Sequence, residues 1–207
     1  NKQTAIWRRP IKEVEDAEYN DFYKMLTLDF NEPAHKIAMH ADVPLQFYAL
    51  LFIPSSSEQN MFSPRKEPGL KLYARKVLIQ EYAKDLLPEW LQFVQGVVDS
   101  EDLPLNVSRE TVQANRLMVN LKNAITKKVL SELKCMAKKK PEDYMTIYEE
   151  WGRLIKQGIF VDPEHRSDVE QLLFFTSTMT NDPEDFHSLQ NYVDRMSDNQ
   201  DDIYYVM

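Results

Sequence analysis

The residue best placed to do chemistry in this sequence is an arginine at the predicted start of a helix. Ser108 is a favourable N-cap residue, and Arg109 follows it directly. A cation there is unfavourable by roughly 0.3–1 kcal/mol, because the helix dipole already makes that end positive. A bound phosphate or carboxylate would reverse the sign of this interaction, since the helix N–H groups and the guanidinium would both bind it. The alternative is that Arg109 forms an ion pair with Asp99, Glu101 or Asp102, and the residue types alone favour this alternative.

Other polar residues near Arg109 carry a weaker signal. Gln113 lies four residues later, so both side chains fall on one face of the predicted helix. Its amide would be able to orient a water or hold a partner loop, although a solvent-facing glutamine is the simpler interpretation. The cluster Asp99, Glu101 and Asp102 would be able to supply a general base, but solvated loop carboxylates are far commoner.

Composition excludes several kinds of site. The 207 residues include four glycines, Gly69, Gly96, Gly152 and Gly158, and no two of them lie within five residues of each other. A loop that wraps phosphate needs clustered glycines, so a self-contained P-loop or dinucleotide site is excluded. No apolar run of about 18 residues occurs, which argues against a membrane span. The four histidines match no zinc spacing, and we expect no metal site. The single cysteine, Cys135, cannot form an internal disulfide, and we expect it to pack beside the apolar stripe of its helix.

Charge is distributed unevenly along the chain. The net charge is −8, but residues 109–140 carry nine positive and two negative side chains, whereas residues 141–207 carry four positive and 15 negative. The lysines of 116–140 invite a nucleic-acid hypothesis. The overall acidity and the lack of interleaved aromatic residues argue against it. A solvated helix face or a dock for an acidic partner is the better interpretation.

Periodicity predicts a mixed α/β fold. Apolar residues recur at helical spacing over 15–28, 85–98, 143–156, 168–173 and 183–196, and in a long helix from Ser108 to about Lys140. Runs of residues that favour strands cover 36–41, 45–53, 70–80, 174–177 and 203–207. Residues 99–106 are expected to form a loop.

These elements predict three parts. Residues 1–140 form a large α-β-α sandwich of the α+β type, 141–173 form a helical connector, and 174–207 begin a smaller α/β unit. The start at Asn1 and the apolar strand-like end at Met207 lead us to expect a piece cut from a longer chain.

The stretch from Gly96 to Glu110, GVVDSEDLPLNVSRE, is long, irregular and therefore specific. It resembles the signature of the heat shock protein 90 chaperone family in its middle segment. The resemblance extends over nearly the whole chain, through EYNDFY at 18–23, LFIP at 51–54, LYARKV at 72–77, LPEW at 87–90 and IYY at 203–205.

The resemblance implies a homodimeric, ATP-driven chaperone. An N-terminal domain of the same polypeptide would bind ATP with Mg, this segment would complete the catalytic site, and a C-terminal domain would dimerise. The family's catalytic-loop arginine falls on Arg109, which would reach the γ-phosphate, and its supporting glutamine and asparagine fall on Gln113 and Asn106. This segment alone is expected to be inactive. Position 109 is thus implied to be a phosphate ligand rather than one half of a local ion pair.

The resemblance also implies contacts with client proteins and cochaperones. Met61 and Phe62 match an amphipathic loop, Phe30 and Leu78 match client-contact positions, and Trp7 is either a core or a contact residue. The sequence departs from the family at Phe30, where many members have Trp, at Thr111-Val112, where two large apolar residues are usual, and at Phe174, where an arginine is usual. Leu78-Ile79-Gln80 and Ala5-Ile6-Trp7 look closer to mitochondrial members than to cytoplasmic ones. A non-catalytic module that binds clients or cochaperones is the alternative function.

Overall fold

The computed structural model describes residues 5–57, 69–104, 112–179 and 186–206, excepting the side chains of 112–115. The chain forms two compact units, Asn1–Glu132 and Leu133–Met207. The predicted mixed α/β class is confirmed, while the division into three parts at 140 and 173 stays a prediction. In the first unit the elements, where η marks a short 3₁₀ helix, are η1 (Ile6–Arg8), η2 (Ile11–Glu13), α1 (Asp16–Thr27), β1 (His35–Ala41), β2 (Phe47–Ile53), β3 (Leu70–Ala74), β4 (Val77–Ala83), η3 (Lys84–Leu86), η4 (Glu89–Leu91), β5 (Gln95–Ser100) and most of α2 (Val112–Lys139).

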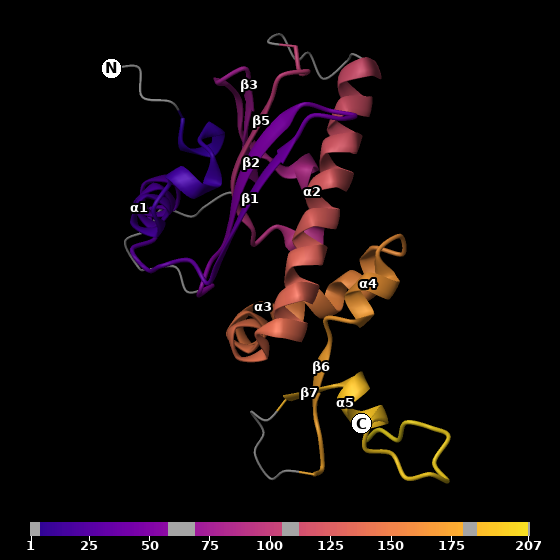
Figure 1. Ribbon diagram of the computed structural model, residues 1–207. Helices are drawn as coiled ribbons and strands as arrows, with labels where there is room; N and C mark the ends of the chain where they lie inside the picture. The colour runs from indigo at the N-terminus through magenta and orange to yellow at the C-terminus, as the bar shows by residue number, and fades with distance from the viewer. Residues whose placement is uncertain (1–4, 58–68, 105–111, 180–185, 207) are drawn as a thin grey trace. The chain divides into compact units, whose positions relative to one another are not determined.

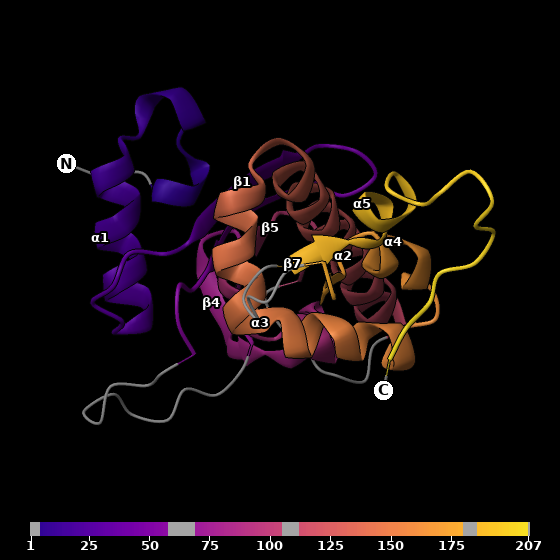
Figure 2. The same ribbon diagram turned by 90° about the horizontal axis from the view of Figure 1, so that it is seen from below.

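The first unit is built on one five-stranded sheet in the order β1-β2-β5-β3-β4. Every neighbouring pair is antiparallel except β3 and β5, which run parallel. Strand β5 is therefore central, between β2 and β3. Helix α1 lies on one side of the sheet and the part of α2 up to Glu132 lies on the other (Figures 1 and 2).

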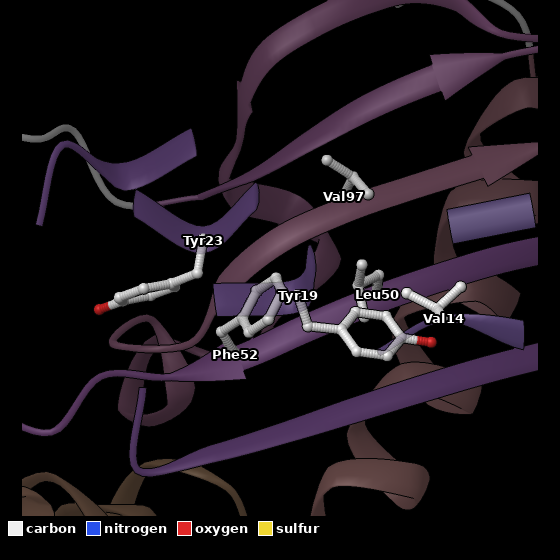
Figure 3. Close-up of a cluster of buried hydrophobic side chains, with 6 residues drawn as sticks. All are labelled: Val14, Tyr19, Tyr23, Leu50, Phe52 and Val97. Atoms are coloured by element: carbon white, nitrogen blue, oxygen red, sulfur yellow. The ribbon is translucent and has the colours of Figure 1, made fainter. Parts of the chain in front are cut away.

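Helix α1 covers its face of the sheet with aromatic side chains. A capping box between Glu15 and Glu18 starts the helix, and Leu28, with φ of 55°, ends it. Tyr23 of the helix packs on Phe52, with ring centroids 5.3 Å apart, and Tyr19 belongs to the same buried cluster. Figure 3 shows the cluster, whose buried members are Val14, Tyr19, Tyr23, Leu50, Phe52 and Val97. Burying each such side chain contributes about 1.5–3 kcal/mol.

Helix α2 follows the predicted spacing. Within the first unit Leu121, Ile125 and Val129 are fully buried at intervals of four residues, as expected for one apolar stripe. The predicted end near Lys140 is confirmed, since α2 ends at Lys139. Cys135, however, is exposed, so the expectation that it packs against the stripe is wrong.

Two predicted elements of the first unit are wrong. Residues 85–98 do not form a helix: two 3₁₀ turns and β5 replace it. The apolar residues there are buried as expected, but their helix-like spacing is coincidental, and Pro88 and the β-branched Val97 and Val98 favour turns and strand. Residues 70–80 are not one strand, because the chain reverses at Arg75 and Lys76 between β3 and β4.

The second unit contains α3 (Pro141–Val161), α4 (Arg166–Glu170), the pair β6 (Phe174–Thr176) and β7 (Phe186–Ser188), and α5 (Leu189–Val193), after the last turns of α2. Helix α3 and strand β6 match the sequence prediction. Over 183–196, β7 occupies three of the residues predicted to be helical, and α5 is shorter than expected. The predicted terminal strand is wrong, since residues 203–206 form no strand and are exposed.

Phe174, the unusual residue of the second unit, lies between two tyrosines of α3. Its ring centroid is 5.5 Å from that of Tyr144 and 5.6 Å from that of Tyr148. The Tyr148 hydroxyl donates to the Phe174 carbonyl at 2.8 Å and accepts from its N–H at 2.9 Å. An apolar side chain at 174 therefore completes an aromatic core.

Candidate functional site

The predicted catalytic residues lie at the edge of what the structure describes. Asn106 and Arg109 fall outside the described residues, and so does the side chain of Gln113, which belongs to the first turns of α2. The two elements on either side of them are described: β5 with residues 101–104 after it, and α2 from Val112. The site is therefore built here from the side chains that hold the end of β5.

Asp99, the second-last residue of β5, is the centre of this arrangement. Its side chain is fully buried. Oδ2 accepts from Trp7 Nε1 at 3.0 Å and from Arg8 Nε at 2.6 Å, and Oδ1 accepts from the Lys76 backbone N–H at 3.1 Å. Burial raises the pKa of Asp99, but the hydrogen bonds from Arg8, Trp7 and Lys76 outweigh it and hold the pKa below its usual value. The expectation of a solvated loop carboxylate is wrong for Asp99, which is a buried anchor in a strand.

Arg8 joins Asp99 to a second carboxylate. Its Nη1 donates to Glu101 while its Nε donates to Asp99, so one guanidinium bridges two residues of the chain leaving β5. The Arg8 side chain is only 11% exposed, and its guanidinium carbon lies 4.9 Å from the centre of the Tyr48 ring. The hydrogen bond to Asp99 raises the pKa of Arg8, so it stays charged. A lysine has no planar fork with which to make the same bridge.

The backbone just after Asp99 is tied to Gln46, the residue before β2. Glu101 N–H donates to the Gln46 carbonyl at 2.9 Å, and the Gln46 N–H donates to Asp102 Oδ2 at 2.7 Å. The Ser100 hydroxyl accepts from the Asp102 N–H at 3.2 Å and donates to the Gln46 carbonyl at 3.3 Å. These bonds fix the direction in which the chain leaves the sheet.

The turn between β3 and β4 also holds the end of β5 through hydrogen bonds. Arg75 and Lys76 have φ of 50° and 70°, a backbone region that non-glycine residues seldom adopt. The Arg75 N–H donates to the Ser100 carbonyl and its Nε donates to the Glu101 carbonyl, both at 3.1 Å, and the Lys76 N–H reaches Asp99. The hydrogen bonds to 99–101 offset the cost of this backbone conformation.

The hydrogen bonds of Asp99, Glu101 and Asp102, which we call the frame at the end of β5, bear on the two interpretations of Arg109. The local ion-pair alternative requires a carboxylate among Asp99, Glu101 and Asp102. Asp99 and Glu101 already bind Arg8, and Asp102 accepts from the Gln46 N–H. The buried Asp99 already accepts from three donors, but the exposed Asp102 accepts only one of the roughly four hydrogen bonds that a carboxylate can accept. Asp102 therefore has acceptor capacity left for an arginine, and the two interpretations of Arg109 both stay open.

A cavity of about 380 Å³ lies between η1, α1, β1 and β2 in the first unit. Its walls are mainly apolar and aromatic and include Trp7, Tyr19 and Tyr48. Its two arginines are engaged, Arg8 with Asp99 and Glu101, and Arg9 with Glu18. A triphosphate there would have to displace these carboxylates, so the cavity is poorly suited to nucleotide.

The predicted contact residues differ in their surroundings. Phe30 is 77% exposed and Leu78 is 46% exposed, both unusual for large apolar side chains. Trp7 is half-buried: its ring lies 5.1 Å from that of Tyr73, and its indole N–H binds Asp99. Met61 and Phe62 lie outside the described residues. The structure thus gives Trp7 an internal role, and its role in contacts stays a prediction.

Part of the lysine face of α2 is engaged in ion pairs. Lys128 binds Glu132 at 2.6 Å, and Lys134 binds Asp168 at 2.5 Å. Among the residues that the structure describes, no group of three or more histidine, cysteine or acidic side chains is arranged to hold a metal ion. No helix in the described ranges is long and apolar enough to cross a membrane.

Sequence reasoning missed Arg8. Nothing local in the sequence links Arg8 to carboxylates more than ninety positions away. Sequence reasoning also placed Asp99 in a loop, which hid the one acidic residue of the cluster that is buried.

The comparisons with known proteins cover the whole chain. A family model described as "Hsp90 protein" matches residues 1–207. The chain is 41% identical over 206 residues to a protein named "Chaperone protein HtpG" from Halorhodospira halophila. This alignment covers 100% of this chain and 32% of the relative. For proteins of the same name the values are 42% over 208 residues in Chlorobium chlorochromatii, covering 99% and 33%, and 40% over 206 residues in Geobacter sulfurreducens, covering 100% and 32%. The chain thus spans about a third of the length of the curated relatives it matches.

Proposed function

Since this chain belongs to the Hsp90 protein family, we propose that it is the middle segment of an ATP-dependent molecular chaperone. In this proposal an N-terminal domain of the same polypeptide binds ATP and Mg, and this segment supplies Arg109 to the γ-phosphate. A C-terminal domain makes the homodimer. Clients and cochaperones bind in part to this segment.

The observation that carries the proposal is the rigid frame before the predicted catalytic residues. Asp99, Glu101 and Asp102 are held by Arg8, Lys76 and Gln46, and the chain continues from there toward Arg109. An arginine that must meet a phosphate on another domain has to be held in place, because misplacement by about 1 Å costs on the order of 100-fold in rate.

The chemistry proposed for Arg109 is electrostatic. Charge spreads over the oxygens of the transferred phosphoryl group in the transition state, and a guanidinium placed beside them stabilises it. The position close to the start of α2 adds partial positive charge from helix N–H groups. Gln113 and Asn106 are proposed to support this arrangement.

The decisive experiment is Arg109→Ala in the full-length protein. We expect ATP turnover to fall about 10²–10³-fold, while the affinity for ATP, which another domain provides, stays within a few fold. Arg116→Ala is the matched control, because Arg116 is an exposed arginine of the same helix. Turnover that is unchanged by Arg109→Ala would refute the catalytic role. The isolated segment should hydrolyse no ATP.

Exposure of Phe30 and Leu78 supports the second part of the proposal, contact with clients. Replacing both by serine should weaken binding of a partly unfolded protein, because two apolar contacts are lost, and should leave folding unaffected. Val119→Ser is the control, since Val119 is 55% exposed but is not a predicted contact. Titration of the segment with the partly unfolded protein measures the effect, and equal affinities of all variants would contradict it. Binding without any effect of Arg109→Ala on turnover would favour the alternative, a non-catalytic interaction module.

A further inference from the structure

The ion pairs of Arg8 connect two parts of the chain that are distant in sequence. Arg8 belongs to η1, near the beginning of the chain, and its two partners lie at and just after the end of β5. The Asp99 side chain is fully buried, and the Glu101 side chain is 29% exposed. A buried guanidinium shared by two carboxylates fixes both in direction as well as in distance.

We propose that Arg8, bridging Asp99 and Glu101, is a positioning residue that fixes the start of the segment leading to Arg109. The inference rests on the proposed function and adds a control of that same site. Arg8 does not touch nucleotide in this proposal; it acts through Arg109.

The sheet alone does not fix this segment. Strand pairing on both sides of β5 reaches Ser100, opposite Phe47 of β2 and Ala74 of β3, and stops there. Glu101 is the first residue beyond the sheet. Its backbone is held by Gln46 and Arg75, and Arg8 is the side-chain partner of its carboxylate within the described residues. Arg109 follows Glu101 by eight positions in the sequence, so in this proposal the direction of the chain at Glu101 determines where the segment that carries Arg109 starts.

The same bridge fixes the segment before α1. Trp7, next to Arg8, donates to the same Asp99 oxygen and packs against Tyr73 of β3 and Phe22 of α1. Residues 6–8 and 99–101 are thus held as one block. A displacement of the beginning of the chain therefore shifts the start of the catalytic segment as well.

The main test compares Arg8→Met with Arg9→Met in the full-length protein. Arg9 is the matched control, because it binds Glu18 and the Glu13 carbonyl, and among the described residues it forms no ion pair with Asp99, Glu101 or Asp102. We expect Arg8→Met to lower kcat for ATP about tenfold with KM within twofold, and Arg9→Met to leave both unchanged. Arg8→Lys should give an intermediate kcat, since an ammonium binds one carboxylate well and two poorly.

A second variant guards against loss of folding. Glu101→Gln keeps the size of a partly exposed side chain and removes only its charge. It should lower kcat in the same direction by a smaller factor, and it should speed hydrogen exchange at the Glu101 amide and not at the amides of β1. An unchanged kcat together with unchanged exchange would overturn the inference.

A double variant separates this inference from the proposed function. If Arg8 acts through Arg109, adding Arg8→Met to Arg109→Ala should cause no further fall in kcat. Independent, multiplicative effects would overturn the positioning role. If Arg109→Ala lowers kcat while Arg8→Met does not, the inference fails and the proposed function stands. If Arg109→Ala has no effect, the proposed function itself fails.

Discussion

Gly96 is a position in β5 where the backbone of the neighbouring strand leaves no room for a methyl group. Its φ is +147°, in a region that side-chain-bearing residues seldom adopt. A Cβ built there would lie 2.3 Å from the Leu50 carbonyl oxygen and 2.8 Å from the Leu51 Cα. Both are backbone atoms of β2, which is paired with β5, so they cannot move aside as the tip of a flexible side chain would.

The cost of Gly96→Ala has two parts. Holding alanine at a positive φ costs of order 1–3 kcal/mol. Pushing β2 away from β5 is overpacking of a close-packed core, which costs typically 1–3 kcal/mol. The expected total of roughly 2–6 kcal/mol is a large share of the 5–15 kcal/mol that stabilises an ordinary domain.

Native-state hydrogen exchange measures this effect within one molecule. Amides of β2 and β5 should exchange about 30-fold to 10⁴-fold faster in Gly96→Ala, given that 1.4 kcal/mol corresponds to tenfold. Amides of α3, in the second unit, are the internal reference. Gly152→Ala is the matched variant: its Cβ would meet ring atoms of Tyr148 at 3.3 Å, and alanine gains about 1 kcal/mol in helix propensity. We therefore expect its net change to stay within about 1 kcal/mol.

A fall in the protection of β2 and β5 of less than about fivefold in Gly96→Ala would refute this reasoning. It would mean that the sheet accommodates the methyl group by a small shift of β2. Equal losses in Gly96→Ala and Gly152→Ala would refute it too, because the close backbone contact exists only at Gly96.

Two further predictions concern stability. Tyr148→Phe should destabilise the second unit by about 1–3 kcal/mol, because it removes the hydroxyl that binds both the N–H and the carbonyl of Phe174. Tyr144→Phe should cost less, since the Tyr144 hydroxyl makes one hydrogen bond, to the Leu172 carbonyl. Urea denaturation compares the two variants, and equal losses of stability would count against this explanation. Because hydrogen bonds lower the pKa of Asp99 in the folded state, its ionised form stabilises the first unit above the unfolded pKa of about 3.9, and this contribution is lost as the pH falls through the lower folded value. Between pH 5 and pH 2, Asp99→Asn should therefore lose less stability than the wild type in urea denaturation, and an unchanged pH dependence would contradict the assignment.

Elements with a regular apolar pattern could be predicted from the sequence, and elements defined by long-range contacts could not. Helices α1, α2 and α3 each bury one stripe, which periodicity detects. Strand β5 is buried on both faces by its central place in the sheet, so its residues show no alternation, and the apolar run before it imitates a helix. The Arg75-Lys76 reversal was missed because neither residue is a usual turn former.

The candidate site also has one residue that the sequence could indicate, Arg109, and one that it could not, Arg8. The run from Gly96 to Glu110 directed attention to Arg109 through its resemblance to a family that the comparisons confirm. Arg8 could not be found in this way, because its role depends on the fold bringing η1 against the end of β5. An ion pair of this kind is defined by tertiary structure alone.

The burial of Asp99 gives its charge a geometric role beside the stability that its ionised form contributes. Replacing a buried ion pair by apolar residues of similar size is often neutral or stabilising, so a carboxylate is a poor choice for filling the core of a sheet. What a carboxylate provides is direction: the indole of Trp7, the guanidinium of Arg8 and the backbone of Lys76 each reach a defined oxygen of Asp99. Three segments from different parts of the chain are thereby held at the residue from which the path to Arg109 begins. An apolar residue at 99 would lose this alignment and leave the nearly buried guanidinium of Arg8 with Glu101 as its remaining carboxylate partner within the described residues.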